Sequence, residues 1–176
     1  MRKAVLKQNN SWAPITLLIG QLVAQLSLIP MIMYAHAWEW IPFVIMYCGM
    51  MLGVTMGYHR YWSHNSFKCP KFIEYLMLFF AHIMMIGPAI TWAANHREHH
   101  RYADTEKDPH SPMYSKNLFD MMWKTVIVYH GILHDTYPVE ERFKKGVPFW
   151  KGLEKVGDNW MVRVLWGTFY TLFYYE

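Results

Sequence analysis

Cysteine is scarce in this chain of 176 residues. Only two occur, Cys48 inside an apolar stretch and Cys69 in a polar one. Neither has a neighbour at the spacing of a metal site, and two cysteines make a poor disulfide framework. The shortage argues against a structural zinc site or an iron–sulfur cluster, because thiolates usually hold both. We interpret both cysteines as structural.

Charged residues are missing from two long stretches, 13–38 and 41–58. A helix needs about 20 apolar residues to cross a bilayer, and both stretches come close to or exceed that length. A soluble domain would distribute its apolar residues periodically, whereas this chain keeps them in blocks between polar segments. The sequence therefore predicts two transmembrane helices, 13–38 and 41–58, joined by a short turn around His36 and Glu39.

The positive charges flank these apolar blocks. Arg2, Lys3 and Lys7 precede the first block, and Arg60, Lys68 and Lys71 follow the second. The net charge of +4 is not gathered on one face, so we expect no nucleic-acid partner. Because cytoplasmic loops are enriched in Lys and Arg, the N-terminus and the segment after Tyr58 are expected to be cytosolic. This makes the chain a multi-pass integral membrane protein.

A third apolar block covers residues 75–95 and is long enough to span the bilayer. Cations lie at both of its ends, and Gly87-Pro88 interrupts it near the middle. A span here would place the histidines before and after it on opposite sides of the membrane. We therefore predict an interfacial or re-entrant segment, with an ordinary third span as the alternative.

The rest of the chain is predicted as a cytosolic part, 96–159, with a helix near 117–134, followed by the start of a further membrane helix at 160–176. The uncharged run from Val164 to Tyr175 holds only about 12 residues, short of a span. The fold class is thus all-α integral membrane, a single domain with a cytosolic histidine-rich cap. We expect the chain to be truncated at its C-terminus.

Five of the ten histidines form two groups, His59-x4-His64 and His96-x2-His99-His100. Positions i, i+3 and i+4 share a helical face, so the second group is a good ligand set. His59 and His64 would lie about 140° apart on an ideal α-helix, and so either bind two metals or mark a helix end. We predict that all five bind metal, although imidazole alone does not name the metal. The pattern His-Glu-x-x-His of zinc proteases is absent.

Other polar residues are candidates for supporting roles, since metal-bound imidazoles need hydrogen-bond partners. Asp104, Asp108 and His110 follow the second histidine group and are predicted to orient its ligands. His130 and His134 lie one helical turn apart, so metal binding is conceivable, but we favour a surface or structural role.

The two histidine motifs and their surroundings resemble the membrane fatty acid desaturases of the delta-9, acyl-CoA desaturase type. The resemblance covers about residues 40 to 135. It rests on Gly57-Tyr58-His59-Arg60-Tyr61-Trp62-Ser63-His64, on His96-Arg97-Glu98-His99-His100-Arg101-Tyr102, and on Asp104-Thr105-Glu106-Lys107-Asp108-Pro109-His110. Related hydroxylases share the histidine spacings but not this context.

The resemblance implies a helical membrane fold with a cytosolic di-iron centre, two iron ions that His59, His64, His96, His99 and His100 help to bind. It implies that O2 is the co-substrate and that a double bond is introduced into an acyl chain. Electrons would come from a ferredoxin or a cytochrome b5-like protein. Trp92, four residues before the second motif, would line the acyl tunnel. No catalytic residue is expected beyond the metal ligands.

Two departures from the family pattern stand out. A third motif, His-x2-His-His, does not follow His134, and five histidines cannot fill two iron coordination spheres. Ala94-Asn95 stands where animal acyl-CoA members carry Arg-Asp, which leaves lipid-, carrier- and CoA-linked substrates open. The alternatives are a membrane di-metal fatty acid hydroxylase and a non-catalytic metal-binding membrane protein. His130, His134, carboxylates and water are candidates for the missing ligands, whose source stays open.

Overall fold

The computed structural model describes residues 12–175, and every regular element among them is a helix. The elements in chain order are α1 (Ala13–Tyr34), the 3-10 turn η1 (Ala37–Glu39), α2 (Trp40–Met50), the π-helix η2 (Met51–Ser63), α3 (Lys71–Ile83), α4 (Ala89–Tyr102), the 3-10 turn η3 (Pro112–Tyr114), α5 (Leu118–Leu133), α6 (Glu141–Lys144), α7 (Lys151–Asp158) and α8 (Trp160–Tyr175). The predicted all-helical architecture is confirmed.

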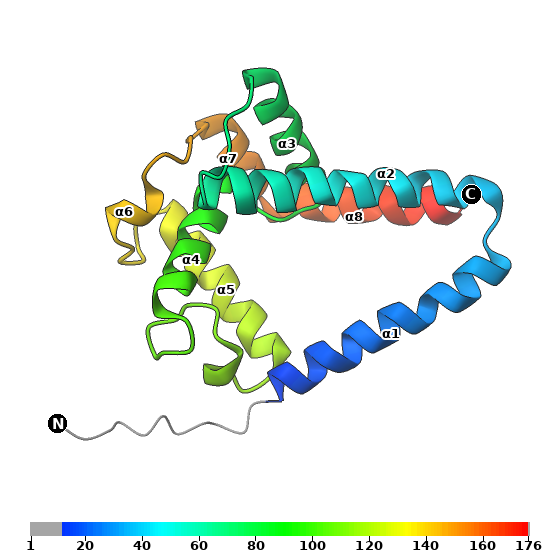
Figure 1. Ribbon diagram of the computed structural model, residues 1–176, viewed down its shortest axis with the longest axis horizontal. Helices are drawn as coiled ribbons and strands as arrows, with labels where there is room; N and C mark the ends of the chain where they lie inside the picture. Colours follow the sequence, from blue (N-terminus) through cyan, green and yellow to red (C-terminus); the bar gives the residue numbers. More distant parts are fainter. Residues whose placement is uncertain (1–11, 176) are drawn as a thin grey trace.

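Two helical stretches are long and apolar enough to cross a membrane, Ile15–Tyr34 and Ala37–Ser63. They meet at η1 and diverge from it, so that α1 and the continuous α2–η2 helix form an open hairpin (Figure 1). Large apolar side chains on them face outward, including Leu18 at 61% and Ile32 at 68% exposure. Exposed apolar surface of this extent fits contact with lipid. The first helix ends earlier than predicted, and the second continues past residue 58.

Glycines allow α3 to pack tightly against the second long helix. Gly49, Gly53 and Gly57 recur every four residues and so lie on one side of the α2–η2 helix. A Cβ at Gly53 would lie 2.5 Å from the backbone N of Ala81, and one at Gly57 would lie 3.0 Å from Cβ of Met77. The absence of side chains at these positions lets the two backbones approach each other closely.

The third apolar block is broken in the middle, as the Gly87-Pro88 pair predicts. Helix α3 ends at Ile83 and α4 begins at Ala89, and Gly87 has a left-handed φ of 101° that favours glycine. The hydroxyl of Tyr58 donates to the carbonyl oxygen of Gly87 at 2.7 Å. In Figure 1 α3 lies above and α4 below the α2–η2 helix. The break thus redirects the chain beside the end of η2.

A buried core forms where η2, α3 and α4 meet. Tyr58, Met77 and Ala93 have no exposed surface there, and Trp62 is almost completely buried. The core lies next to the end of the long helix and holds the first part of α4 against it. The first histidine motif, in η2, and the second, in α4, are therefore placed by the same packed cluster.

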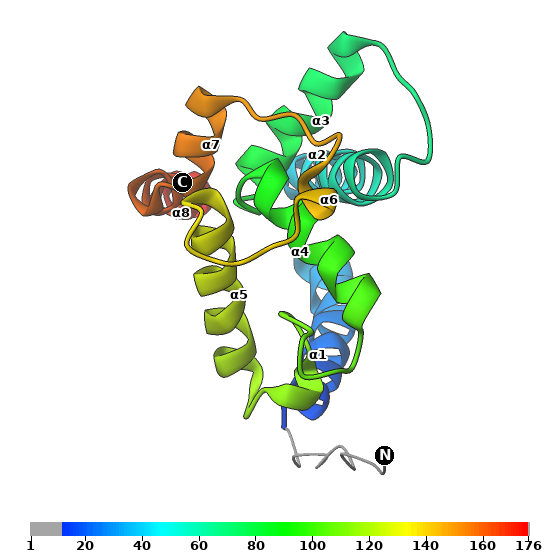
Figure 2. The same ribbon diagram turned by 90° about the vertical axis from the view of Figure 1, so that its left-hand side faces the viewer.

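The polar part of the chain contains α5, in agreement with the helix predicted near 117–134. Asn117 Oδ1 accepts from the backbone N–H of Asp120 at 2.9 Å and caps the first turn. Figure 2 shows α5 beside α4, with α7 above it and α8 leading away from the end of α7. The hydroxyl of Tyr170 in α8 donates to the carbonyl oxygen of Ile83 at 2.6 Å, which ties α8 to the end of α3.

Candidate metal centre

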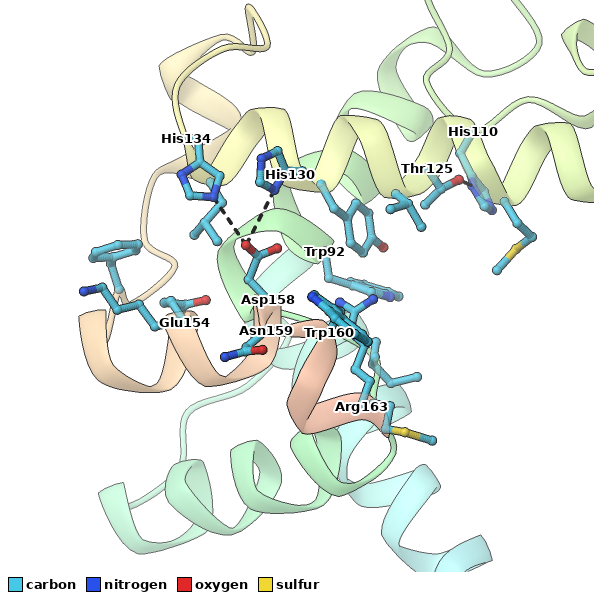
Figure 3. Close-up of a pocket in the computed structure, with 18 residues that line it drawn as sticks. Trp92, His110, Thr125, His130, His134, Glu154, Asp158, Asn159, Trp160 and Arg163 are labelled. Atoms are coloured by element: carbon cyan, nitrogen blue, oxygen red, sulfur yellow. Dashed lines mark hydrogen bonds and ion pairs between the residues drawn. The ribbon is translucent and has the colours of Figure 1, made fainter. Parts of the chain in front are cut away.

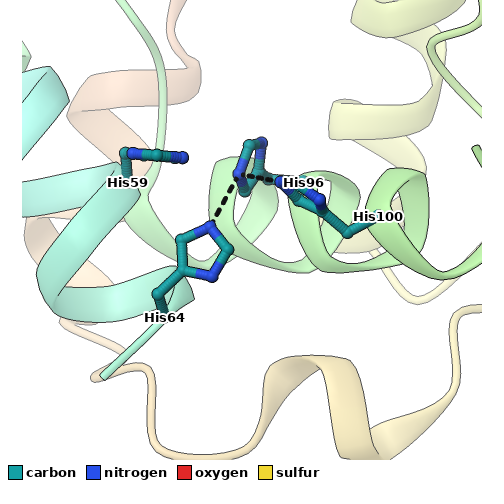
Figure 4. Close-up of side chains that lie close together, drawn as sticks. All are labelled: His59, His64, His96 and His100. Atoms are coloured by element: carbon teal, nitrogen blue, oxygen red, sulfur yellow. Dashed lines mark hydrogen bonds between the residues drawn. The ribbon is translucent and has the colours of Figure 1, made fainter. Parts of the chain in front are cut away.

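Four histidines from two helices converge at one point. The ligand nitrogens of His59, His64, His96 and His100 lie within 4.8 Å of one another. Nε2 of His96 is 3.3 Å from Nε2 of His64 and 2.9 Å from Nε2 of His100. Figure 4 shows the four rings directed toward a common centre between η2 and α4.

The π-helical geometry of η2 aligns the first motif. The backbone N–H of His64 donates to the carbonyl oxygen of His59 at 3.2 Å, an i→i+5 hydrogen bond. Because this hydrogen bond brings residues five apart to nearly the same side of the helix, the two ring centroids lie only 4.7 Å apart. The 140° separation expected for an ideal α-helix is therefore wrong. The two histidines face one centre together.

In the second motif, His96 and His100 lie one turn apart and face the first motif, but His99 faces elsewhere. Its Nδ1 lies 2.8 Å from Oδ1 of Asp108 and 2.9 Å from Oδ2. The expectation that all three imidazoles point in one direction is therefore corrected. Since Asp108 occupies Nδ1, only Nε2 of His99 stays available to a ligand, next to but outside the cluster of four.

Of the three predicted supporting residues, Asp108 has the contacts of a ligand-orienting group. Its side chain is fully buried and accepts from the backbone N–H groups of Asp104 and His110 at 3.1 and 2.9 Å. Asp104 thus contributes its backbone to this network, while its side chain lies exposed. The Nδ1 of His110 lies 2.7 Å from Oγ1 of Thr125 in α5.

The electrostatics of the cluster suit a cation. Burial, followed by the neighbouring His100, His59 and His64, lowers the pKa of His96 to about 3. The imidazole is therefore neutral at physiological pH, the form that binds metals. Adjacent nitrogen ligands at about 2.1 Å from an ion are roughly 3.0–3.4 Å apart, which matches the Nε2 separations here. The residues present fit a metal ion.

Trp92 lies between this cluster and a pocket. Its ring stacks on His96 with centroids 4.7 Å apart and an interplanar angle of 21°. It also lines a pocket of about 1010 Å³ whose surface is mostly apolar and to which Met122 and Val126 of α5 contribute. Figure 3 shows Trp92 on the wall of this pocket. A mostly apolar pocket that opens beside a polar cluster is the usual form of a small-molecule site.

Arg97 is a further site residue, one that the spacing of the histidines does not indicate. Its guanidinium donates to the backbone carbonyl oxygens of Trp62, Ser63, Phe143 and Lys145. It therefore joins the end of η2 to the loop after α6. Its position inside the second motif was the only signal in the sequence.

His130 and His134 do not join the four histidines. They lie near Asp158 of α7, in a separate group on the pocket wall. The idea that these two histidines replace missing ligands of the main centre is not supported by this placement. Neither Asp158 nor its buried neighbour Glu154 was indicated by a motif.

Comparison with known proteins gives evidence that is independent of the geometry. The family described as fatty acid desaturase matches residues 35–175. Delta-9 acyl-lipid desaturase 2 of Arabidopsis thaliana is 40% identical over 84 residues, which are 48% of this chain and 27% of that protein. Icosanoyl-CoA 5-desaturase of Limnanthes douglasii is 37% identical over 82 residues, which are 45% of this chain and 23% of that protein.

These matches cover only part of each relative. A chloroplastic palmitoyl-monogalactosyldiacylglycerol delta-7 desaturase of Arabidopsis thaliana is 40% identical over 73 residues, 42% of this chain and 20% of that protein. The matched stretch spans 20–27% of the length of these three relatives. No solved structure matches the chain.

Proposed function

Because this chain belongs to the fatty acid desaturase family, we propose that it is part of an enzyme that introduces a double bond into a fatty acyl chain. The reaction uses O2 at a di-iron centre that the histidines bind. The observation that carries this proposal is the convergence of His59, His64, His96 and His100 beside the Trp92 pocket. An apolar substrate and a redox metal would meet at that junction.

The four converging histidines would hold one iron ion, and Nε2 of His99 would be free to hold the second. This division follows the geometry, because Asp108 holds Nδ1 of His99 and turns the ring away from the other four. The five motif histidines leave ligand positions of the second ion to other groups. Iron bound there would supply the redox chemistry: O2, two electrons from a donor, two protons and two hydrogens from the acyl chain give the alkene and two water molecules.

The chain's own residues position the substrate beside the centre. Trp92 separates the pocket from His96 and presents its other surface to the acyl chain. The buried Tyr58 lies against Trp92, with ring centroids 5.9 Å apart, and so supports the tryptophan from within the core. An acyl chain that enters the apolar pocket displaces water and lies beside the histidine-bound metal.

The apolar surfaces and the distribution of Lys and Arg support one membrane arrangement. Helix α1 and the α2–η2 helix cross the bilayer, and the N-terminus and both histidine motifs lie on the cytosolic side. Helix α3 and the break before α4 lie in the interface, and α8 begins a further membrane helix. The aqueous side of the centre is then open to a soluble electron donor of the ferredoxin or cytochrome b5 type. The acyl substrate, whether lipid-, carrier- or CoA-linked, enters from the lipid side.

The test is expression of the longest reading frame that contains this chain in a desaturase-deficient host, followed by analysis of its fatty acids. We expect new unsaturated fatty acids, and none from a His96→Ala variant. The matched control is His36→Ala, which removes a histidine from the turn between the two long helices and leaves product formation intact.

The products discriminate between related reactions. Alkenes support desaturation, whereas hydroxylated acyl chains would identify a hydroxylase with the same ligand arrangement. Unchanged lipids from a well-expressed, iron-loaded protein would contradict the proposal.

A further inference from the structure

Helices α5 and α7 bring three metal-binding side chains together on the pocket wall. His130 and His134 come from α5, and Asp158 is the last residue of α7. Oδ2 of Asp158 lies 3.3 Å from Nε2 of His134 and 3.6 Å from Nδ1 of His130. Their ligand atoms all lie within 4.8 Å of one another. Figure 3 shows both imidazoles directed at the carboxylate across the gap between the two helices.

The two histidines are aligned by the α-helix itself. They are four residues apart, and their ring centroids lie 4.2 Å from each other. Two imidazoles one turn apart form a common half of a zinc or iron site, to which a carboxylate from another element is added. The group shares no member with the four histidines of the main centre.

Close packing holds Asp158 in place. A Cβ at the preceding Gly157 would lie 3.2 Å from Nε2 of His82 and 3.4 Å from N of Pro88. The guanidinium of Arg163 donates to the carbonyl oxygen of Gly157 at 3.1 Å. These contacts fix the end of α7 against the α3–α4 break, so the carboxylate is positioned by the fold and not by the two histidines alone.

Glu154 is a second observation that points to a ligand on this wall of the pocket. It lies one helical turn before Asp158, lines the same pocket and is only 2% exposed. Its Oε2 has no hydrogen-bond partner among the described residues. A buried carboxylate oxygen without a partner is unfavourable, and a cation held by the neighbouring Asp158 would stabilise its ionised form.

We propose that His130, His134 and Asp158 form a second metal site for a divalent first-row transition metal such as Zn²⁺, with Glu154 on the same pocket wall adding negative charge near the ion. Imidazole and carboxylate together are the ligand set that Zn²⁺ accepts in four-coordinate sites. The metal joins α5 to α7 and so fastens one wall of the pocket. It takes no part in the chemistry at the four histidines. Without a metal, these partly exposed ion pairs contribute little to stability.

The experiment measures zinc bound to the purified full-length protein in detergent after excess Zn²⁺ is removed by desalting. We expect the wild type to retain one equivalent of zinc more than a His130→Gln/His134→Gln variant. Asp158→Asn keeps the shape of the side chain and removes its charge, and should weaken this binding at least tenfold. His36→Gln is the control for histidine loss outside both groups and should retain the wild-type amount.

A second comparison separates this site from the main centre. His96→Ala should lose metal at the four histidines and keep the equivalent that Asp158→Asn loses. Equal zinc content in the wild type, the double variant and Asp158→Asn would overturn the proposal, as would an equal loss in His36→Gln. Circular dichroism establishes that each variant retains its helices. If the double variant fails to fold, the comparison between Asp158→Asn and the wild type decides.

Discussion

Nε of Arg97 donates to the carbonyl oxygen of Ser63 at 2.8 Å and so links the two histidine motifs directly. Ser63 is the last residue of η2 and precedes His64, while Arg97 follows His96 in α4. The last carbonyls of a helix have no partner within it, and here the guanidinium supplies one. The contact therefore sets the distance between two ligands from different helices.

Replacement of Arg97 by lysine should weaken metal binding at the four histidines. A lysine ammonium is a compact donor and cannot reach four carbonyl oxygens in the way the planar guanidinium does. Each lost hydrogen bond from a charged group is worth about 1.5–3 kcal/mol, so we expect at least a tenfold loss of iron affinity. The measurement is iron content after dialysis against a graded series of chelator concentrations. Arg101→Lys, at an exposed position of the same helix, should retain wild-type affinity.

Asp108 and Asp104 offer a matched pair of carboxylates. Asp108→Asn removes the charge that orients Nδ1 of His99, and loss of such a partner typically costs 10–100-fold in metal affinity. Asp104→Asn changes an exposed side chain and keeps the backbone N–H that Asp108 uses. Iron stoichiometry of the two purified variants tests this, with loss expected for Asp108→Asn alone. Equal iron content would refute an orienting role for Asp108.

A methyl group at Gly53 should disrupt the contact between η2 and α3. The added Cβ would lie 2.5 Å from N of Ala81 and 2.9 Å from the carbonyl carbon of Phe80, both backbone atoms that cannot rotate away. We expect Gly53→Ala to destabilise the protein by about 1–3 kcal/mol, read as a lower apparent Tm in detergent. Gly20→Ala is the control, since a Cβ there meets nothing within 4 Å. Because alanine favours a helix over glycine, helix propensity cannot lower the Tm, and a similar drop in both variants would refute a specific role for the contact with α3.

Glu154 should make stability depend on pH. Burial raises the pKa of this carboxyl from 4.5 to about 7. Between these values the folded protein keeps the proton that the unfolded chain has lost, so stability falls as pH rises through this range. Glu154→Gln should match the wild type near pH 4 and exceed it at pH 8 by up to about 3 kcal/mol, since one pKa unit is worth about 1.4 kcal/mol.

Thermal unfolding of both proteins at a series of pH values, with chelator present, tests the Glu154 prediction. Other titratable groups line the same pocket and are common to the two proteins, so their effects cancel in the difference: His110, His130, His134, Lys155, Asp158 and Arg163. A difference in stability that does not grow between pH 4 and pH 8 would show that Glu154 stays ionised when buried.

Trp92 should control the substrate without holding the metal. Trp92→Ala opens the pocket beside His96 and removes the stacked ring, so we expect a changed distribution of product chain lengths or double-bond positions. Iron content should stay at the wild-type level, because the indole contributes no ligand. Fatty acid analysis of cells that express the full-length variant, together with iron analysis, checks both expectations. Loss of iron with no change in the remaining product would assign Trp92 a structural role.

Much of the helical architecture could be predicted because its causes are local. The uncharged runs mark the two long helices, and Gly87-Pro88 marks the break, since proline and a left-handed glycine both end a helix. Asn117 marks the start of α5 through its side-chain cap. Each of these signals lies within a few residues of the feature that it predicts.

The exact directions of the histidines could not be predicted, because they depend on non-local contacts. An apolar run does not distinguish an α-helix from a π-helix, so the shared direction of His59 and His64 was missed. His99 turns away from His96 because a buried carboxylate nine residues later holds it. Asp158 meets His134 only through the packing of α7 against α5, which no spacing in the sequence encodes.

Because η2 is a π-helix, the directions of His59 and His64 depend more on how many residues the helix contains than on which residues they are. Each residue turns an α-helix by about 100° and a π-helix by somewhat less, so the loss of a single residue between Gly53 and Tyr58 would rotate the preceding helix by roughly 80–100° relative to His59. Either Gly49 and Gly53 would no longer face α3, or the imidazoles of His59 and His64 would no longer face α4. A substitution at an exposed position such as Met56 would preserve the directions of both the glycines and the imidazoles. Gain or loss of one codon in this segment is therefore more damaging than most substitutions in it.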